Sequence, residues 1–216
     1  METIKKEELK KILVSITATM EKTKEELIAL DAAMGDGDLG LTMCKGFQTV
    51  TAEIDKINEP DMGNLIMKLG MKMNSEVPST MGTLVSTCFI KGGLKAKGKT
   101  ELHLADLVEM GRAAVQGVME RGQSKVGDKT MLDALHPAVE ALAVAAEAGK
   151  SLAGAQQLAY QAAVEGVEKT KIMKSVHGRA AYYSENSIGR QDPGATAMMY
   201  IIKGIANACA KANSTL

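Results

Sequence analysis

The chain has 216 residues, enough for one substantial hydrophobic core, and no Pro- or Ser-rich linker divides it, so we expect residues 1–216 to form a single domain. Its 26 basic residues balance its 26 acidic residues, and this zero net charge gives no sign of the basic face that binds nucleic acid. No stretch has the roughly 20 apolar residues of a membrane span, and the N-terminus does not lead into the apolar region of a signal peptide, so we expect a cytoplasmic protein.

The composition favours an all-α fold. There are four Tyr, two Phe and no Trp, whereas Gly occurs 21 times and Met 15 times. Small residues let helix backbones approach closely, and Met fills irregular gaps between them. The three cysteines are isolated and odd in number, which argues against a disulfide framework and against a thiolate zinc site.

Apolar residues at helical spacing organise the first half of the chain. They predict a helix over about 6–30, a second over about 41–57, and a third that Asp61 can cap. Residues 83–91 fit either a strand or a helix. Residues 92–100 are predicted to be a loop.

The second half continues the helical pattern. It predicts helices over 102–120 and 130–148, a further helix opening at Ser151, and a last helix with Pro193 at its first position. A long irregular segment, residues 172–192, precedes that last helix. About eight helices joined by mostly short connections place neighbours antiparallel, which gives a barrel or bundle of eight antiparallel helices.

Four polar, glycine-rich connections stand out in this arrangement. They are the first, third, fifth and seventh in order, at residues 31–40, 77–82, 122–129 and 177–194. In an up-and-down helical body, alternate connections lie at the same end. If residues 83–91 are helical, the four connections converge on one mouth. Long polar loops inside a compact domain are more often functional than not.

The first connection concentrates negative charge. Asp31, Asp36 and Asp38 fall within eight positions, and no Lys or Arg occurs between Asp31 and Lys45. At separations near 6 Å each pair repels by about 3 kcal/mol at an effective dielectric of about 20. A hard cation such as Mg²⁺ or Ca²⁺ would relieve this repulsion. The alternative is ordinary turn chemistry, because Asp caps helices and Gly accepts positive φ.

Two other known motifs partly match the sequence. An EF-hand loop starting at Asp36 fails, because its fifth and twelfth positions are Gly40 and Phe47, where oxygen ligands are required. Residues 93–100 match the phosphate-loop pattern G-x-x-x-x-G-K-[ST], with residues 84–90 as the strand before it. That fold needs several parallel strands, and no other segment is predicted to be one, so a chance match is favoured.

Three motifs in order carry a resemblance to a known family. They are the acidic stretch at 30–40, Gly127-Asp128-Lys129-Thr130-Met131, and the segment from Gly178-Arg179-Ala180 to Asp192-Pro193-Gly194-Ala195. With them the chain resembles, nearly end to end, the nucleotide-binding L subunit or L domain of the dihydroxyacetone kinases. The resemblance implies a barrel of eight antiparallel helices with ADP or ATP at one mouth.

The resemblance also implies roles for residues. It implies that Asp31, Asp36 and Asp38 hold two Mg²⁺ ions that bridge the nucleotide phosphates. Three carboxylates and ADP carry about six negative charges, which two Mg²⁺ cannot cancel, so cationic side chains are needed. Arg179 is our first choice for stabilising the transferring phosphoryl group, and Lys129 the second. The residues expected at the nucleotide are Ser79, Thr80, Met81, Gly82, Lys129, Thr130, Met131, Asp192, Pro193 and Gly194.

The chain departs from the family in two places. Leu39 stands where the family commonly has His. The family's G-G-A-S-G-P-L is here the stretch 78–84, in which only Gly82 and Leu84 hold their places and Met81 replaces a serine expected near the nucleotide. Ser79, Thr80 and the helix N-terminus could still bind an anion. These departures suggest a divergent branch, with a different sugar substrate as one consequence.

The function expected from the resemblance is that of one subunit in a phosphoryl relay. With a separate K subunit that holds the sugar, the chain would phosphorylate dihydroxyacetone or a related short ketose. ADP would stay bound and be rephosphorylated by a phosphohistidine carrier subunit, M. Two alternatives remain: an ATP-dependent two-subunit kinase, and a nucleotide-sensing regulatory paralogue without turnover.

Overall fold

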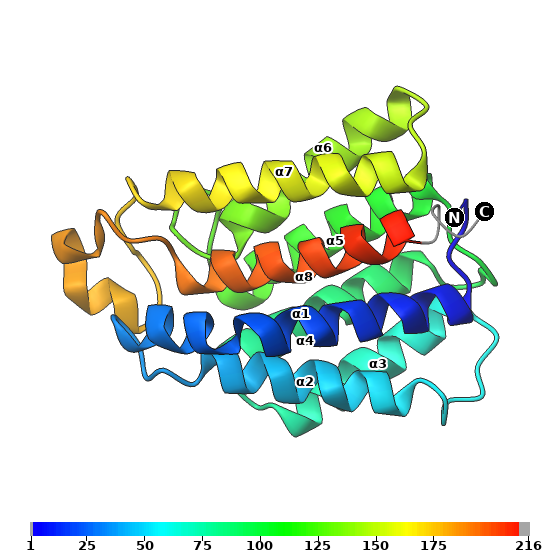
Figure 1. The fold of residues 1–216 in the computed structure, drawn as a ribbon, viewed down its shortest axis with the longest axis horizontal. Helices are drawn as coiled ribbons and strands as arrows, with labels where there is room; N and C mark the ends of the chain where they lie inside the picture. The colour runs from blue at the N-terminus through cyan, green and yellow to red at the C-terminus, as the bar shows by residue number, and fades with distance from the viewer. Residues whose placement is uncertain (1, 212–216) are drawn as a thin grey trace.

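Eight α-helices run up and down in chain order in the computed structural model, which describes residues 2–211 (Figure 1). A 3₁₀ helix, η1 (Arg179–Ser187), lies between the last two. No strand occurs in this described part, where one isolated bridge joins Ile4 and Leu102. The all-α prediction is confirmed. The helices are α1 (Lys6–Ala32), α2 (Leu39–Glu53), α3 (Met62–Glu76), α4 (Thr80–Lys95), α5 (Leu104–Gly122), α6 (Leu132–Glu147), α7 (Leu152–Thr170) and α8 (Pro193–Lys211).

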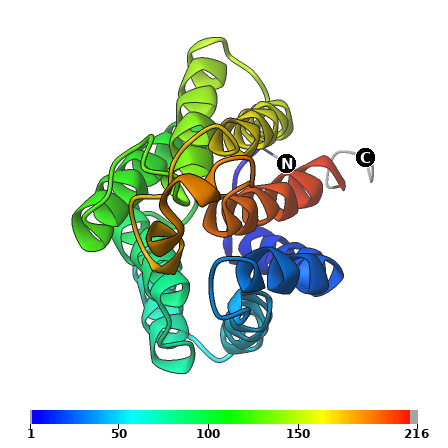
Figure 2. The ribbon, with the colours of Figure 1, turned by 90° about the vertical axis from the view of Figure 1, so that its left-hand side faces the viewer.

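The helices close into a ring. Each helix packs against its neighbours in the chain, and α1 packs against α8, which joins the two ends of the series (Figure 2). Further contacts link α6 with α8 and α2 with α4. The predicted barrel of eight antiparallel helices is therefore the observed architecture.

Short polar side chains begin several of these helices. Asp61 caps α3, Ser79 caps α4 and Ser151 caps α7, each accepting the backbone N–H three residues on, at 2.9, 3.0 and 3.2 Å. Such caps satisfy N–H groups that have no partner inside the helix. Pro193 is the first residue of α8, where its missing N–H costs nothing. The predicted starts at Asp61, Ser151 and Pro193 are confirmed.

The largest difference from the prediction lies in α4. Residues 83–91 are helical, and the helix continues through residues 92–95, which were predicted to be a loop. Gly92 and Gly93 are buried there because helices meet closely at this point: a Cβ on Gly93 would lie 2.7 Å from the carbonyl oxygen of Gly63. The phosphate-loop interpretation is wrong, since a helix and not a strand leads into its first glycine.

Apolar side chains face the inside of the ring. They line a partly open cavity of about 240 Å³, whose walls are almost wholly apolar groups such as Ile12, Met110, Leu135 and Ile202 from four helices. Such a lining offers phosphate groups nothing to bind. Within residues 2–211, no helix combines the length and apolar content needed to cross a membrane.

One end of the barrel gathers the four polar connections. Since neighbouring helices are antiparallel, the α1–α2, α3–α4, α5–α6 and α7–α8 connections lie at the same end. In Figure 1 this is the left-hand end, where the turn after α1 and the segment containing η1 lie, while α1 begins and α8 ends toward the right. The connectivity thus forms a mouth, as the sequence predicted.

Candidate functional site

The acidic turn, residues 31–38, is shaped by hydrogen bonds among its own residues. Asp31 lies in the last turn of α1, and its carbonyl oxygen accepts the amide of Gly35. Its carboxylate accepts the amides of Asp38 and Leu39 at 3.1 and 3.3 Å, and so caps the start of α2. Gly37 adopts a φ of +73°, a conformation that favours glycine. The chain therefore folds back upon Asp31 within eight residues.

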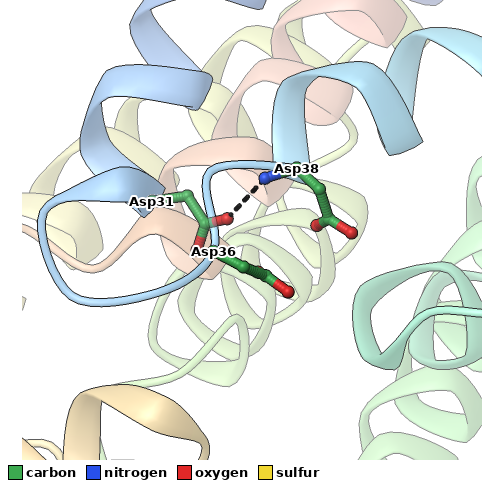
Figure 3. Close-up of side chains that lie close together, drawn as sticks. All are labelled: Asp31, Asp36 and Asp38. Carbon is green, nitrogen blue, oxygen red and sulfur yellow. Dashed lines mark hydrogen bonds between the residues drawn. The ribbon is translucent and has the colours of Figure 1, made fainter.

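This turn brings the three predicted metal ligands together. One carboxylate oxygen from each of Asp31, Asp36 and Asp38 lies within 4.8 Å of the others (Figure 3). Burial, reinforced by the charges of Asp36 and Asp31, raises the pKa of Asp38 above its usual range. Three carboxylates this close repel by about 3 kcal/mol per pair at an effective dielectric of about 20. The all-oxygen donor set fits Mg²⁺ or Ca²⁺, and cation binding here stays a prediction.

Arg179 reaches this cluster from the other side of the mouth. Its guanidinium lies 2.8 Å from the carboxylate of Asp36, with 64% of the side chain exposed. Gly178, with a φ of +65°, turns the chain into η1 immediately before it. An ion pair this exposed is worth at most about 1 kcal/mol. Arg179 can therefore exchange Asp36 for another anion at small cost.

The N-terminus of α4 supplies a third side of the mouth. The Ser79 hydroxyl is engaged as the helix cap, Thr80 is exposed, and Met81 is partly buried against the core. A Cβ on Gly82 would overlap the carbonyl oxygen of Val77, so this position requires glycine. The first-turn amides of a helix carry partial positive charge, which suits an anion.

The α5–α6 connection is organised by a residue that the sequence did not single out. The buried carboxylate of Asp133 accepts the amides of Gly127 and Thr130 at 2.6 and 2.7 Å. Met131, expected at the nucleotide, is 2% exposed at the start of α6. The T-x-x-D spacing from Thr130 to Asp133 is typical of a capping box and could have identified Asp133.

Lys129 differs most from its predicted environment. It is 3% exposed, and its ammonium donates to the backbone carbonyls of Met173, Ser187 and Arg190, at 3.2 Å for the first and 2.7 Å for the last. An ammonium has three donors, so all are used. Burial lowers the pKa of Lys129. The structure thus gives Lys129 carbonyl partners where the sequence predicted a nucleotide contact.

Asp192 is also part of the framework. It is 7% exposed, and its carboxylate caps α8 by accepting the amide of Ala195 at 2.7 Å, while its own amide donates to the Thr170 hydroxyl at 2.9 Å. Burial raises the pKa of Asp192 to about 7. A Cβ on Gly194 would lie 3.5 Å from the amide nitrogen of Met131. The stretch from Asp192 to Gly194 therefore adjoins Met131.

A second contact, which is partly buried, joins the fifth and seventh connections. The imidazole of His177, two residues before Arg179, lies 2.8 Å from the Asp128 carboxylate. The same carboxylate also accepts the amide of Lys125 at 2.9 Å. Although burial opposes it, these hydrogen bonds hold the pKa of Asp128 below its usual range. No local pattern in the sequence links His177 and Asp128, which are 49 positions apart.

Comparison with known proteins places this geometry in a family. A model described as the DAK2 domain matches residues 33–207, which include Asp36, Asp38 and Arg179. The chain is 37% identical over 182 residues to the ADP-binding subunit DhaL of the PEP-dependent dihydroxyacetone kinase of Escherichia coli, covering 84% of this chain and 87% of that one. It is 34% identical over 194 residues to an ADP-binding subunit DhaL of Listeria innocua, covering 85% of each.

A solved structure of a dihydroxyacetone kinase has a similar fold. The dihydroxyacetone kinase of Citrobacter freundii in complex with AMP-PNP and Mg²⁺ superposes with a TM-score of 0.69 and 26% identity. The match covers 91% of this chain but only 33% of that larger protein. The chain therefore belongs to the DAK2 domain family, and its relatives there include the ADP-binding subunits of dihydroxyacetone kinases.

Proposed function

We propose that this chain is the nucleotide-binding subunit of a kinase for dihydroxyacetone or a related short ketose, working in the cytoplasm. In this proposal a phosphoryl group passes from a phosphohistidine carrier, the M subunit, through ADP to the sugar on a separate K subunit. The observation that carries the proposal is the cluster of three carboxylates within 4.8 Å, with the Arg179 guanidinium 2.8 Å from one of them. The relatives that are ADP-binding subunits support the nucleotide.

The acidic turn would hold the cations. Asp31, Asp36 and Asp38 offer oxygen ligands from one short turn, and their mutual repulsion favours a divalent ion between them. Bound Mg²⁺, as two ions in this proposal, would neutralise phosphate charge and orient the phosphate oxygens. The Citrobacter freundii structure with Mg²⁺ supports the choice of metal.

Arg179 would stabilise the transferring group. Catalysis of phosphoryl transfer consists mainly of positioning and charge stabilisation, because the chemistry needs little covalent help from the protein. The guanidinium is exposed, always charged and already beside the carboxylates. By leaving Asp36 for a phosphoryl oxygen, it would place its charge where negative charge develops.

The nucleotide would lie across the mouth toward α4. The first-turn amides of α4, at Thr80, Met81 and Gly82, suit a phosphate, and Met81 offers an apolar surface for the base or ribose. The other residues that we expect beside the nucleotide are Ser79, Thr130, Met131, Pro193 and Gly194.

The test is mass spectrometry of the small molecules released when the purified protein is denatured, followed by calorimetry with Mg–ADP. We expect about one ADP per chain, or tight binding of added Mg–ADP by protein that carries none. Absence of both retained nucleotide and binding would overturn the proposal. Free exchange of ATP, with no retained ADP, would favour the ATP-dependent two-subunit kinase over the carrier-driven relay.

A further inference from the structure

We propose that Lys129 is a positioning residue, whose ammonium closes the two ends of the segment 173–190 so that Arg179 is held at the acidic turn. The inference rests on the proposed function for the role of Arg179. It replaces the expectation that Lys129 itself meets the nucleotide.

The three carbonyl partners of Lys129 lie on both sides of Arg179 in the segment 173–190. Met173 precedes η1, Ser187 ends it, and Arg190 follows it. Arg179 lies between the first partner and the other two. One ammonium therefore joins the entry and the exit of the segment that carries Arg179, from a residue 44 to 61 positions away.

Other hydrogen bonds also join the entry and the exit of this segment. The amide of Ser175 donates to the Ser187 hydroxyl at 2.9 Å, and the amide of Gly189 donates to the carbonyl oxygen of Lys171 at 2.7 Å. These bonds link entry to exit directly. Lys129 lies at the same junction and adds a buried cation, whose hydrogen bonds to carbonyl oxygens are stronger than those between neutral groups.

The backbone and the side chain of Lys129 are both fixed in this arrangement. Its backbone adopts a φ of +62°, which residues other than glycine rarely do, and its side chain is 3% exposed. All three donors of the ammonium are used. A phosphate contact would require the ammonium to give up all three of these hydrogen bonds, of which the one to Ser187 is buried and the other two are partly buried.

Arg179, in contrast, has no such anchor of its own. Its guanidinium contacts Asp36 on the surface, and 64% of the side chain is exposed. Its place at the mouth therefore depends on how the segment is held. Lys129 supplies that hold from the motif Gly127-Asp128-Lys129.

The experiment is a double-mutant cycle between Lys129→Met and Arg179→Ala in the full chain, with Mg–ADP affinity measured by calorimetry. The exposed guanidinium of Arg179 can exchange Asp36 for a phosphate of ADP, so its loss should weaken binding of Mg–ADP as well as phosphoryl transfer. Methionine is one atom shorter than lysine and keeps its unbranched apolar stem, but it donates no hydrogen bond. We expect each single variant to bind about tenfold more weakly and the double variant also about tenfold more weakly, because both remove the same contribution. A hundredfold loss in the double variant would show independent contributions and overturn the proposal.

Lys174→Met is the matched control. Lys174 lies in the same segment, but its ammonium forms an exposed pair with Glu185 at 2.7 Å. We expect its Mg–ADP affinity to stay within about twofold of wild type, as for other exposed pairs. A loss equal to that of Lys129→Met would mean that any lysine of the mouth matters and would overturn the specific role.

Hydrogen exchange of the nucleotide-free protein provides a second, independent measurement. In Lys129→Met we expect the amides of Ser175 and Gly189 to exchange at least tenfold faster, with helix α1 unchanged. Unchanged exchange would overturn the proposal even if affinity fell. If wild type binds no Mg–ADP, the proposed function fails, while this measurement still decides whether Lys129 closes the segment.

Ser187→Ala covers the case in which Lys129→Met does not fold. It removes the hydroxyl that accepts the Ser175 amide, and so loosens the same junction without emptying the lysine site. We expect faster exchange at Ser175 and about threefold weaker Mg–ADP binding that does not add to the effect of Arg179→Ala. Full additivity with Arg179→Ala would contradict the proposal.

Discussion

Two regions of the mouth meet at the Arg179–Asp36 pair but are built in opposite ways. The acidic turn, residues 31–38, takes its shape from hydrogen bonds that span at most eight residues. The segment 173–190 takes its shape from residues far away in the chain, such as Lys129 and Asp128. One wall of the site is encoded locally, whereas the other depends on the completed barrel.

This difference predicts different responses to mutation. Changes in the framework beneath the α5–α6 connection should destabilise the whole protein, because that connection is packed into the barrel. Changes in the acidic turn should leave the barrel intact, cost little stability and act mainly on ligand binding. The following variants test this contrast, in order of decreasing effect on stability.

Gly166→Ala should have the largest effect. A Cβ at this position of α7 would overlap the carbonyl oxygen of Asp133, whose carboxylate shapes the α5–α6 connection. Backbone cannot move aside cheaply, so we expect a loss of about 3 kcal/mol in the free energy of unfolding and a Tm lower by roughly 6–12 °C. Urea and thermal unfolding followed by circular dichroism would measure both.

Gly154→Ala is the control on the same helix. There a Cβ would meet only the hydroxyl of Ser151, at 3.3 Å. We expect a stability equal to or slightly above that of wild type, because Ala is the better helix former. If both variants were destabilised equally, close packing of α7 against Asp133 would not be the cause.

Asp192→Asn should change how stability depends on pH. Since burial raises the pKa of Asp192 to about 7 from 3.8, the folded protein keeps a proton on this carboxyl that the unfolded chain has released. The contribution of this group to stability therefore falls as pH rises, by about 2 kcal/mol between about pH 5 and pH 7.

Asparagine can still accept the amide of Ala195 but does not titrate. We therefore expect the variant to lose this decline, so that it gains stability relative to wild type as pH increases over that range. Urea unfolding of both proteins at pH 5, 6, 7 and 8 would measure the difference. Parallel pH dependences in the two proteins would show that Asp192 is ionised in the fold throughout.

Gly35→Ala should break the local region with little cost to the barrel. A Cβ here would overlap the far end of the Asp31 side chain and lie 2.9 Å from the Asp31 carbonyl oxygen. The carboxylate can move, so we expect a stability loss of only about 1 kcal/mol. Because Asp31 then leaves the cluster, calorimetry should show about tenfold weaker Mg²⁺-dependent nucleotide binding; unchanged binding would contradict a ligand role for Asp31.

The same contrast explains what the sequence could predict. Helix periodicity, the caps at Asp61 and Ser151, and the acidic turn are properties of neighbouring residues, and all three were visible. Helix α4 was cut short because Gly92 and Gly93 indicate a loop locally, whereas their actual role is close packing against α3 and α5.

The long-range contacts could not be predicted in the same way. The carbonyl oxygens that bind Lys129 belong to Met173, Ser187 and Arg190. Because every residue has a backbone carbonyl, the sequence cannot indicate which of them will bind a lysine. His177 and Asp128 carry suitable chemistry, but only the ring of helices brings them together. Contacts between neighbouring residues could therefore be predicted from the sequence, and contacts between distant residues could not.

The smallest effect on stability, and the most direct test of the account, should come from Asp36→Asn. We expect its nucleotide-free Tm to stay within about 1 °C of wild type, because Asp36 is exposed and its loss relieves repulsion as well as an exposed ion pair. Asp55→Asn is the control. Asp55 lies in the α2–α3 connection, at the other end of the barrel, and the substitution breaks its exposed ion pair with Lys10 of α1.

The decisive measurement is the rise in Tm on adding Mg–ADP to these three proteins. At a concentration about 100 times its Kd, a ligand adds about 2.7 kcal/mol to the free energy of unfolding, which raises the Tm by roughly 5–10 °C. We predict that wild type and Asp55→Asn show this rise and that Asp36→Asn loses most of it. Equal rises in all three proteins would contradict the claim that the acidic turn binds the Mg–nucleotide.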